Sequence, residues 1–161
     1  MKLAIIVMGM VLTAAVPLKG WSQVPGGRAT RTPLELPAVG PYANAKAAFD
    51  AGYAYWEQRQ YLEAASALTE ATKLDPNMFE AFYDLGILLN HLRQTEKGMN
   101  ALRRAIALRP DVTAAYIQLG QIIVQYPGSD KNEARQLALK AVELDPKSID
   151  AHMLLGLVYF Q

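Results

Sequence analysis

The histidines, cysteines and carboxylates of the chain decide what chemistry it could perform. His91 and His152 are the only histidines and no cysteine occurs, so thiol catalysis and a zinc site built on sulfur are excluded. The motifs GxxxxGK[ST], GxGxxG, HExxH and GxSxG are all absent. Acids such as Asp50, Glu57 and Glu63 fall on predicted solvated helix faces, without a pairing that would shift a pKa. We therefore expect no enzyme activity, no metal site and no cofactor.

Aromatic side chains offer a different chemistry, that of binding. Phe49, Tyr53 and Trp56 lie four and three residues apart, which places them on one side of a helix. Such side chains dominate binding energies when a partner desolvates them. Phe49 and Trp56 could equally serve packing within the fold, and both interpretations stay open at this point.

The helices that would carry these side chains are predicted from an internal period. Glycines and prolines return after 34 residues and then after 36 residues, and the two additional residues fall between Gly120 and Ala134. The recurring positions are Gly52, Gly86, Gly120 and Gly156, and Pro76, Pro110 and Pro146. Independent positions that share one period and one insertion indicate a repeat protein.

Each repeat is predicted to form two helices, the second of which ends at a proline. Apolar residues follow i, i+3, i+7 spacing in the first half of a repeat and i, i+4, i+7 spacing in the second, and each pattern is one face of a helix. His152 occupies the slot of Phe82 and Tyr116, so we expect it to pack, whereas His91 should face solvent. The prolines then end the second helix, and small residues let the two helices approach closely.

The repeat resembles the tetratricopeptide repeat over residues 45–161. The resemblance implies an all-α, right-handed superhelical solenoid of antiparallel helix pairs. Its units would be 45–78, 79–112 and 113–148, with the first helix of a fourth unit at 149–161. Arg59 and Arg93 stand where the family often has glycine in the turn between helices, and Gly98 replaces the usual alanine.

The resemblance also implies a binding groove lined by the first helix of each unit. An extended or helical peptide with apolar anchors would fit it. Family members that grip the carboxylate end of heat-shock chaperones use a lysine and an asparagine where this chain has Phe49 and Tyr53, so we expect no such clamp. The predicted groove residues are Lys46, Phe49, Tyr53, Trp56, Tyr83, Ile87, Asn90, Ile117 and Gln121.

The N-terminus predicts export. Lys2 is followed by an uncharged apolar run at 3–16, which matches a secretory signal and is short for a membrane span. We expect a signal peptide at 1–22, cleaved after Ser22, with Ala15 as a second candidate and an uncleaved membrane anchor as the alternative. The proline- and glycine-rich segment 23–44 is expected to be a disordered tether. A periplasmic or extracellular location, in a bacterium, follows.

The last predicted helix leaves two further hypotheses about function. Residues 153–160 carry no charge, so the helix could be part of a longer, truncated array, or it could mediate self-association through Leu154, Leu157, Val158 and Phe160. With 16 basic and 15 acidic residues in the whole chain, charge gives no reason to expect nucleic acid as a partner. The leading expectation is an exported adaptor that binds a protein or peptide, in assembly of an envelope or secretion complex.

Overall fold

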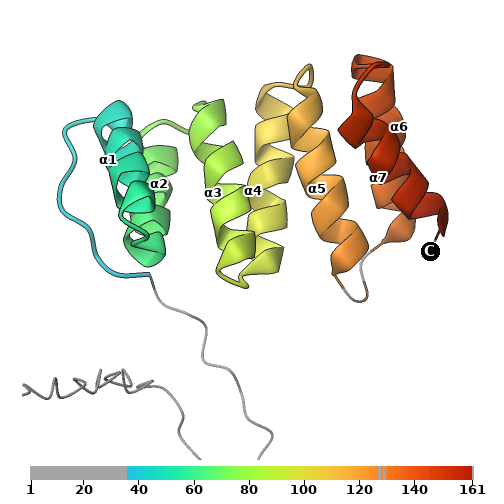
Figure 1. Ribbon diagram of the computed structural model, residues 1–161. Helices are drawn as coiled ribbons and strands as arrows, with labels where there is room; N and C mark the ends of the chain where they lie inside the picture. Colours follow the sequence, from blue (N-terminus) through green and yellow to red (C-terminus); the bar gives the residue numbers. More distant parts are fainter. Residues whose placement is uncertain (1–35, 127, 129, 161) are drawn as a thin grey trace, which may run out of the picture. The chain divides into compact units, whose positions relative to one another are not determined.

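Seven helices, as three consecutive antiparallel pairs and the first helix of a fourth unit, lie in the residues that the computed structural model describes, 36–126, 128 and 130–160 (Figure 1). The first helices of the pairs are α1 (Ala45–Glu57), α3 (Phe79–His91), α5 (Thr113–Gln125) and α7 (Ile149–Phe160). The second helices are α2 (Tyr61–Leu74), α4 (Thr95–Leu108) and α6 (Lys131–Leu144). The expected all-α helical repeat is confirmed.

Contacts between helices stay local along the chain. Each helix packs mainly on its own pair partner and on the helix that follows, and α5 also contacts α7 and, to a smaller extent, α3. This neighbour-only arrangement is typical of repeat proteins, in which stability is close to a sum over units and the interfaces between them. None of the helices in the described part of the chain is long and apolar enough to cross a membrane.

The helices of the first two pairs cross where a glycine faces a leucine. A methyl group added at Gly52 would lie 2.9 Å from Leu68 Cγ, and one added at Gly86 would lie 2.6 Å from Leu102 Cγ. The backbones come closer in the second pair, because a methyl group at Gly98 would lie 2.7 Å from the Gly86 carbonyl oxygen. The glycine that departs from the family's usual alanine therefore permits a tighter crossing of α3 and α4.

The third pair fills the same space with a residue from another helix. The position of Leu68 and Leu102 is taken by Ala138 in α6, and the side chain that faces Gly120 is Leu154 of α7. Leu154 is only 1% exposed. A side chain of the following unit thus replaces one that the third unit lacks.

Two of the turns between paired helices end in the same backbone motif. The amides of Arg59 and Gln60 donate to the carbonyls of Trp56 and Tyr55, and those of residues 93 and 94 donate to the carbonyls of residues 90 and 89. This is the Schellman pattern, which needs a left-handed residue just after the helix. Arg59 and Arg93 adopt it with φ of 60° and 62°. A non-glycine residue pays about 1 kcal/mol for that conformation, so glycine would suit both places.

The final part of the expected tether is packed and not free. Residues 1–35 lie outside the described residues. Segment 36–44 has no helix, but Leu36 packs against the cluster of α2 and α3, and the buried Ser66 hydroxyl donates a 2.6 Å hydrogen bond to the Pro37 carbonyl. Asn44 then accepts a hydrogen bond from the Ala47 amide and caps α1. The expectation of disorder up to residue 44 is wrong for this part, because its apolar residues find partners on the domain.

Candidate peptide-binding face

The groove face is defined here as the surface formed by the first helices, α1, α3, α5 and α7. Most of the predicted groove residues are accessible on it: Lys46, Tyr53 and Trp56 are exposed, and Phe49, Tyr83, Ile87, Asn90 and Gln121 are partly exposed. Ile117 is the exception, since it is only 7% exposed and packs with Tyr116, Ala141 and Ala151. Its cluster joins α5 to both α6 and α7, so the expectation that Ile117 lines the groove is wrong.

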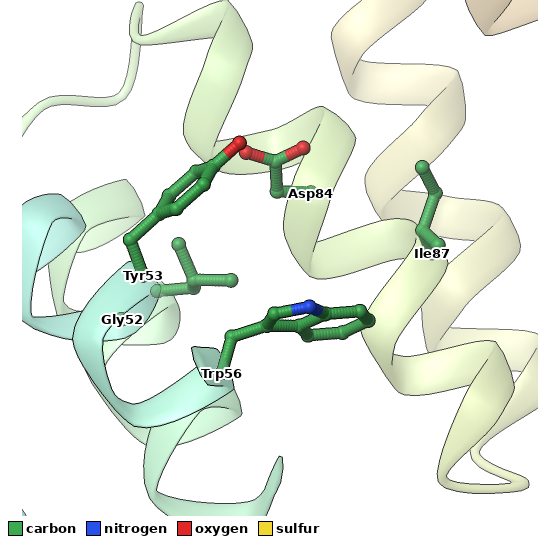
Figure 2. A pocket seen from close by; sticks show the side chains of 6 residues that line it. Gly52, Tyr53, Trp56, Asp84 and Ile87 are labelled. Carbon is green, nitrogen blue, oxygen red and sulfur yellow. The ribbon is translucent and has the colours of Figure 1, made fainter. Parts of the chain in front are cut away.

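A hollow of about 210 Å³ opens on this face between α1 and α3. Figure 2 shows Tyr53 and Trp56 extending from α1, and Asp84 and Ile87 carried by α3. Gly52 and Leu68 complete the lining. Tyr53 is 54% exposed and Trp56 is 42% exposed, so both keep aromatic surface for a ligand.

The aromatic residues of α1 divide between packing and exposure. Phe49 packs against the buried clusters of the first two pairs, which is the structural role. Trp56 has both roles: it makes an edge contact with Tyr61 at 5.4 Å between ring centroids, yet a large part of it faces solvent. His91, exposed as expected, lies near both rings, 5.1 Å from Tyr61 and 6.5 Å from Trp56 between ring centroids.

Asp84 is the only acidic residue in the lining of the hollow. Burial, and secondarily the nearby charge of Glu80, raises the pKa of Asp84 to about 6. Among the described residues, no side chain or amide donates a hydrogen bond to its carboxylate, and no base forms an ion pair with it. Asp84 also raises the pKa of Tyr83, after the larger effect of burial. The hollow therefore presents an uncompensated carboxylate beside two aromatic rings.

The repeat itself explains why Asp84 lacks a partner. Asp50 occupies the same position one unit earlier, and there Lys46 donates to both carboxylate oxygens, at 2.7 and 3.0 Å. The residue at the place of Lys46 in the second unit is Glu80, which repels Asp84. Sequence reasoning missed Asp84, although the replacement of a lysine by a glutamate one turn before a repeated aspartate was the available signal.

Charge is divided unequally between the two sets of helices. The first helices carry five acids and a single lysine: Asp50, Glu57, Glu80, Asp84 and Asp150, with Lys46. The second helices carry seven bases and five acids. The first helices thus carry an excess of acids in a chain that is almost neutral overall, although Asp50 and Glu80 each have a basic partner in Lys46 and Arg109.

The raised pKa of Asp84 predicts that Asp84→Asn stabilises the protein at neutral pH. The unfolded carboxyl ionises near pH 3.9, so below about pH 3 both states hold the proton and the residue has no effect. Between about pH 4 and pH 6 the unfolded state ionises first, and the folded state loses stability as pH rises. The shift sets an upper limit near 3 kcal/mol, and because solvent reaches the carboxylate we expect about 1 kcal/mol.

Urea unfolding at about pH 7.5 and about pH 3 checks this prediction. Asp84→Asn should be more stable than the parent at the higher pH and equal to it at the lower pH. Asp50→Asn is the matched control, because it removes the same group at the same repeat position but breaks the pair with Lys46. A gain of stability in both variants, or a gain that persists at low pH, would contradict a buried ionised Asp84.

The structure buries one of the residues expected to mediate self-association and leaves the others at the surface. Leu154 belongs to the core over Gly120, so its assignment to an exposed apolar face is wrong. Leu157 and Phe160 are exposed and Val158 is partly exposed.

His152 is exposed, against the expectation of packing, and its ring contacts the Pro146 carbonyl at 3.0 Å. Tyr116 contacts the Pro110 carbonyl in the same way one unit earlier.

No group of three or more His, Asp or Glu side chains among residues 36–126, 128 and 130–160 is arranged to hold a metal ion.

Comparison with known proteins identifies the repeat. Residues 49–113 match the model of the tetratricopeptide repeat family. No curated protein sequence matches the chain. The solved structures similar to it include the first tetratricopeptide domain of Spaghetti (RPAP3) bound to the HSP90 peptide SRMEEVD, at 21% identity and a TM-score of 0.66, covering 73% of this chain and 91% of that one.

Two other structures share the fold at similar sequence identity and TM-score. MamA is 26% identical with a TM-score of 0.67, covering 73% of this chain and 67% of that one. The second tetratricopeptide domain of human RPAP3, in complex with the HSP70 peptide SGPTIEEVD, is 18% identical with a TM-score of 0.65, covering 71% of this chain and 94% of that one. The chain therefore has the fold of a tetratricopeptide-type helical repeat.

Proposed function

We propose that this tetratricopeptide-type repeat is an exported, non-catalytic adaptor that binds a protein or peptide on its groove face, in assembly of an envelope or secretion complex. The observation that carries the binding role is the hollow between α1 and α3, which leaves Tyr53 and Trp56 exposed to a ligand. Large aromatic side chains that a partner can desolvate are the usual anchors of a protein interface.

Similar structures support binding as a class of function. Both RPAP3 domains hold short peptides of heat-shock proteins. Those peptides end in two glutamates, a valine and an aspartate, whereas the first helices here carry five acids and one base. A partner of this chain would therefore differ in charge from those peptides, in line with the absence of a lysine and an asparagine at Phe49 and Tyr53.

Export is proposed from the sequence alone. A basic residue at Lys2 and the apolar run 3–16 have the composition of a secretory signal. A fusion of the first 22 residues to a reporter that is active only outside the cytoplasm would test it, and a silent reporter would contradict this part of the proposal.

Peptide selection tests the binding role directly. The full-length protein is used to select peptides from a displayed library of short random sequences, and the selected peptides are synthesised and titrated. Tyr53→Ala should weaken their binding about tenfold, because it removes an exposed anchor. Leu139→Ala is the control, since Leu139 is a comparably exposed apolar side chain, at 47%, on a second helix. Failure to select any binder, or equal losses in both variants, would count against a groove-face site.

Self-association is a second candidate function, favoured by α7. Ile149, Met153, Tyr159 and Phe160 are exposed, and a methyl group added at Gly156 would meet nothing within 4 Å, unlike those at the three equivalent glycines. An exposed apolar helix face of this kind suits contact with a second copy. Light scattering over a range of concentrations would separate the two candidates, because only this one requires an oligomer.

A further inference from the structure

We infer that the hollow of Tyr53, Trp56 and Asp84 receives an arginine side chain of the bound partner. The inference rests on the proposed binding function and specifies its ligand: a peptide segment in which an arginine is the anchor residue. Three features of the described residues carry it, namely the aromatic walls, the lone carboxylate and the charge of the groove face.

The aromatic walls fit a flat cation. A guanidinium group is attracted to the face of a tryptophan or tyrosine ring, and the attraction grows when water is excluded. Tyr53 and Trp56 lie one helical turn apart on α1 and both line the hollow, so a single ligand group could contact both. The chain itself already uses this contact: the guanidinium carbon of Arg109 lies 5.0 Å from the centre of the Phe79 ring.

The carboxylate selects for a positive charge. Asp84 lines the same hollow and has no hydrogen-bond or ion-pair partner among the described residues. Its raised pKa shows that burial already penalises its ionised form, and a cation placed beside it would remove that penalty. A carboxylate accepts two parallel hydrogen bonds from guanidinium, which favours arginine over lysine at an aromatic site.

The surroundings of the hollow favour the same ligand. The nearby first helices add Glu57 to Asp84, whereas Asp50 is paired with Lys46 and Glu80 lies 3.7 Å from the Arg109 guanidinium. An acidic peptide would meet the like charge of Glu57 and Asp84 on α1 and α3, while a basic peptide would be attracted to it. An apolar anchor would fit the rings but would leave the Asp84 carboxylate buried without a partner, which is costly.

Substitution of one peptide residue tests the inference. The probe is a peptide selected with the full-length protein as described above, synthesised in three forms that carry arginine, lysine or citrulline at the basic position. Citrulline keeps the shape of arginine and removes its charge. We expect citrulline to bind about tenfold or more weakly than arginine, and lysine to lie between them.

Protein variants then locate the arginine. Asp84→Asn should weaken binding of the arginine peptide about tenfold and leave binding of the citrulline peptide within about twofold, since the charge it would meet is gone. Asp50→Asn, with the same charge change at the equivalent position, should leave both affinities within about twofold. Equal losses for the arginine and citrulline peptides in Asp84→Asn would overturn the inference.

The outcome of the selection separates this inference from the proposed function. Selected peptides that lack a basic residue but lose affinity in Tyr53→Ala would overturn the arginine anchor and leave the groove-face site intact. A selection that yields no binding peptide would overturn both. Circular dichroism of each variant confirms that the fold is retained before any loss of affinity is interpreted.

Discussion

Leu154→Ala should lower the free energy of unfolding by about 3 kcal/mol, the largest effect that we expect from one substitution. The Leu154 side chain is 1% exposed and fills the space over Gly120 where α5 and α7 meet. Its truncation leaves a cavity, because α6 offers only Ala138 at the position that carries leucine in the other two pairs. Thermal unfolding followed by circular dichroism should show a melting point lower by about 10 °C.

A second substitution should recover much of that loss. Ala138→Leu added to Leu154→Ala restores a leucine at the position of Leu68 and Leu102, so α6 would now fill the space itself. Ala138→Leu alone should destabilise, because Ala138 is fully buried and its added volume would meet Leu154. The double-mutant cycle gives the coupling between the two sites. Additive losses would show that Leu154 does not substitute for the missing leucine.

Gly98→Ala should destabilise the protein by about 2 kcal/mol, although alanine is the better helix former. In an isolated helix the substitution would gain up to about 1 kcal/mol. Here the new methyl group would lie 2.7 Å from the Gly86 carbonyl oxygen and 3.1 Å from the Asn90 amide nitrogen, and backbone atoms cannot rotate away. The helices α3 and α4 would have to separate.

The first helix pair supplies the control for that prediction. Ala64 stands at the position of Gly98, and a methyl group at Gly52 would lie 3.5 Å from the Ala64 carbonyl oxygen, an ordinary contact. Ala64→Gly should therefore destabilise by about 2 kcal/mol, through lower helix propensity and the loss of a buried methyl group. Urea unfolding of both variants measures the two effects. A more stable Gly98→Ala would show that the two crossings are equally spaced.

The period of the sequence was sufficient to predict the fold. Positions that must be small, such as Gly52 and Gly86, and prolines that must end helices recur at a fixed interval, so helix pairs could be derived without coordinates. The interval does not show which unit supplies the side chain that fills the space beside a given glycine. Leu154 lies in the fourth unit and fills a space in the third, and only the packed structure reveals that exchange.

The binding face was predictable in outline and not in its chemistry. Tyr53 and Trp56 could be placed on an exposed helix side from their spacing, and the structure finds both exposed. Burial of Ile117 depends on how α6 and α7 pack on α5, which the periodicity of one helix does not contain. The role of Asp84 could not be predicted from one repeat unit. The hollow that Asp84 lines is formed by helices of two units, and the residue one turn before it is Glu80 and not a lysine that could pair with it.

The contact between Pro37 and Ser66 determines how the domain would carry mechanical load. Tension applied through the chain ahead of residue 36 would reach the middle of α2 through that hydrogen bond and the packing of Leu36, before it reached the start of α1 at Asn44. The segment 36–44, which lies between that contact and α1, would carry little of the force, so α1 would not be loaded directly. Tyr53 and Trp56 could therefore keep their positions while the protein is held under strain from its N-terminal side.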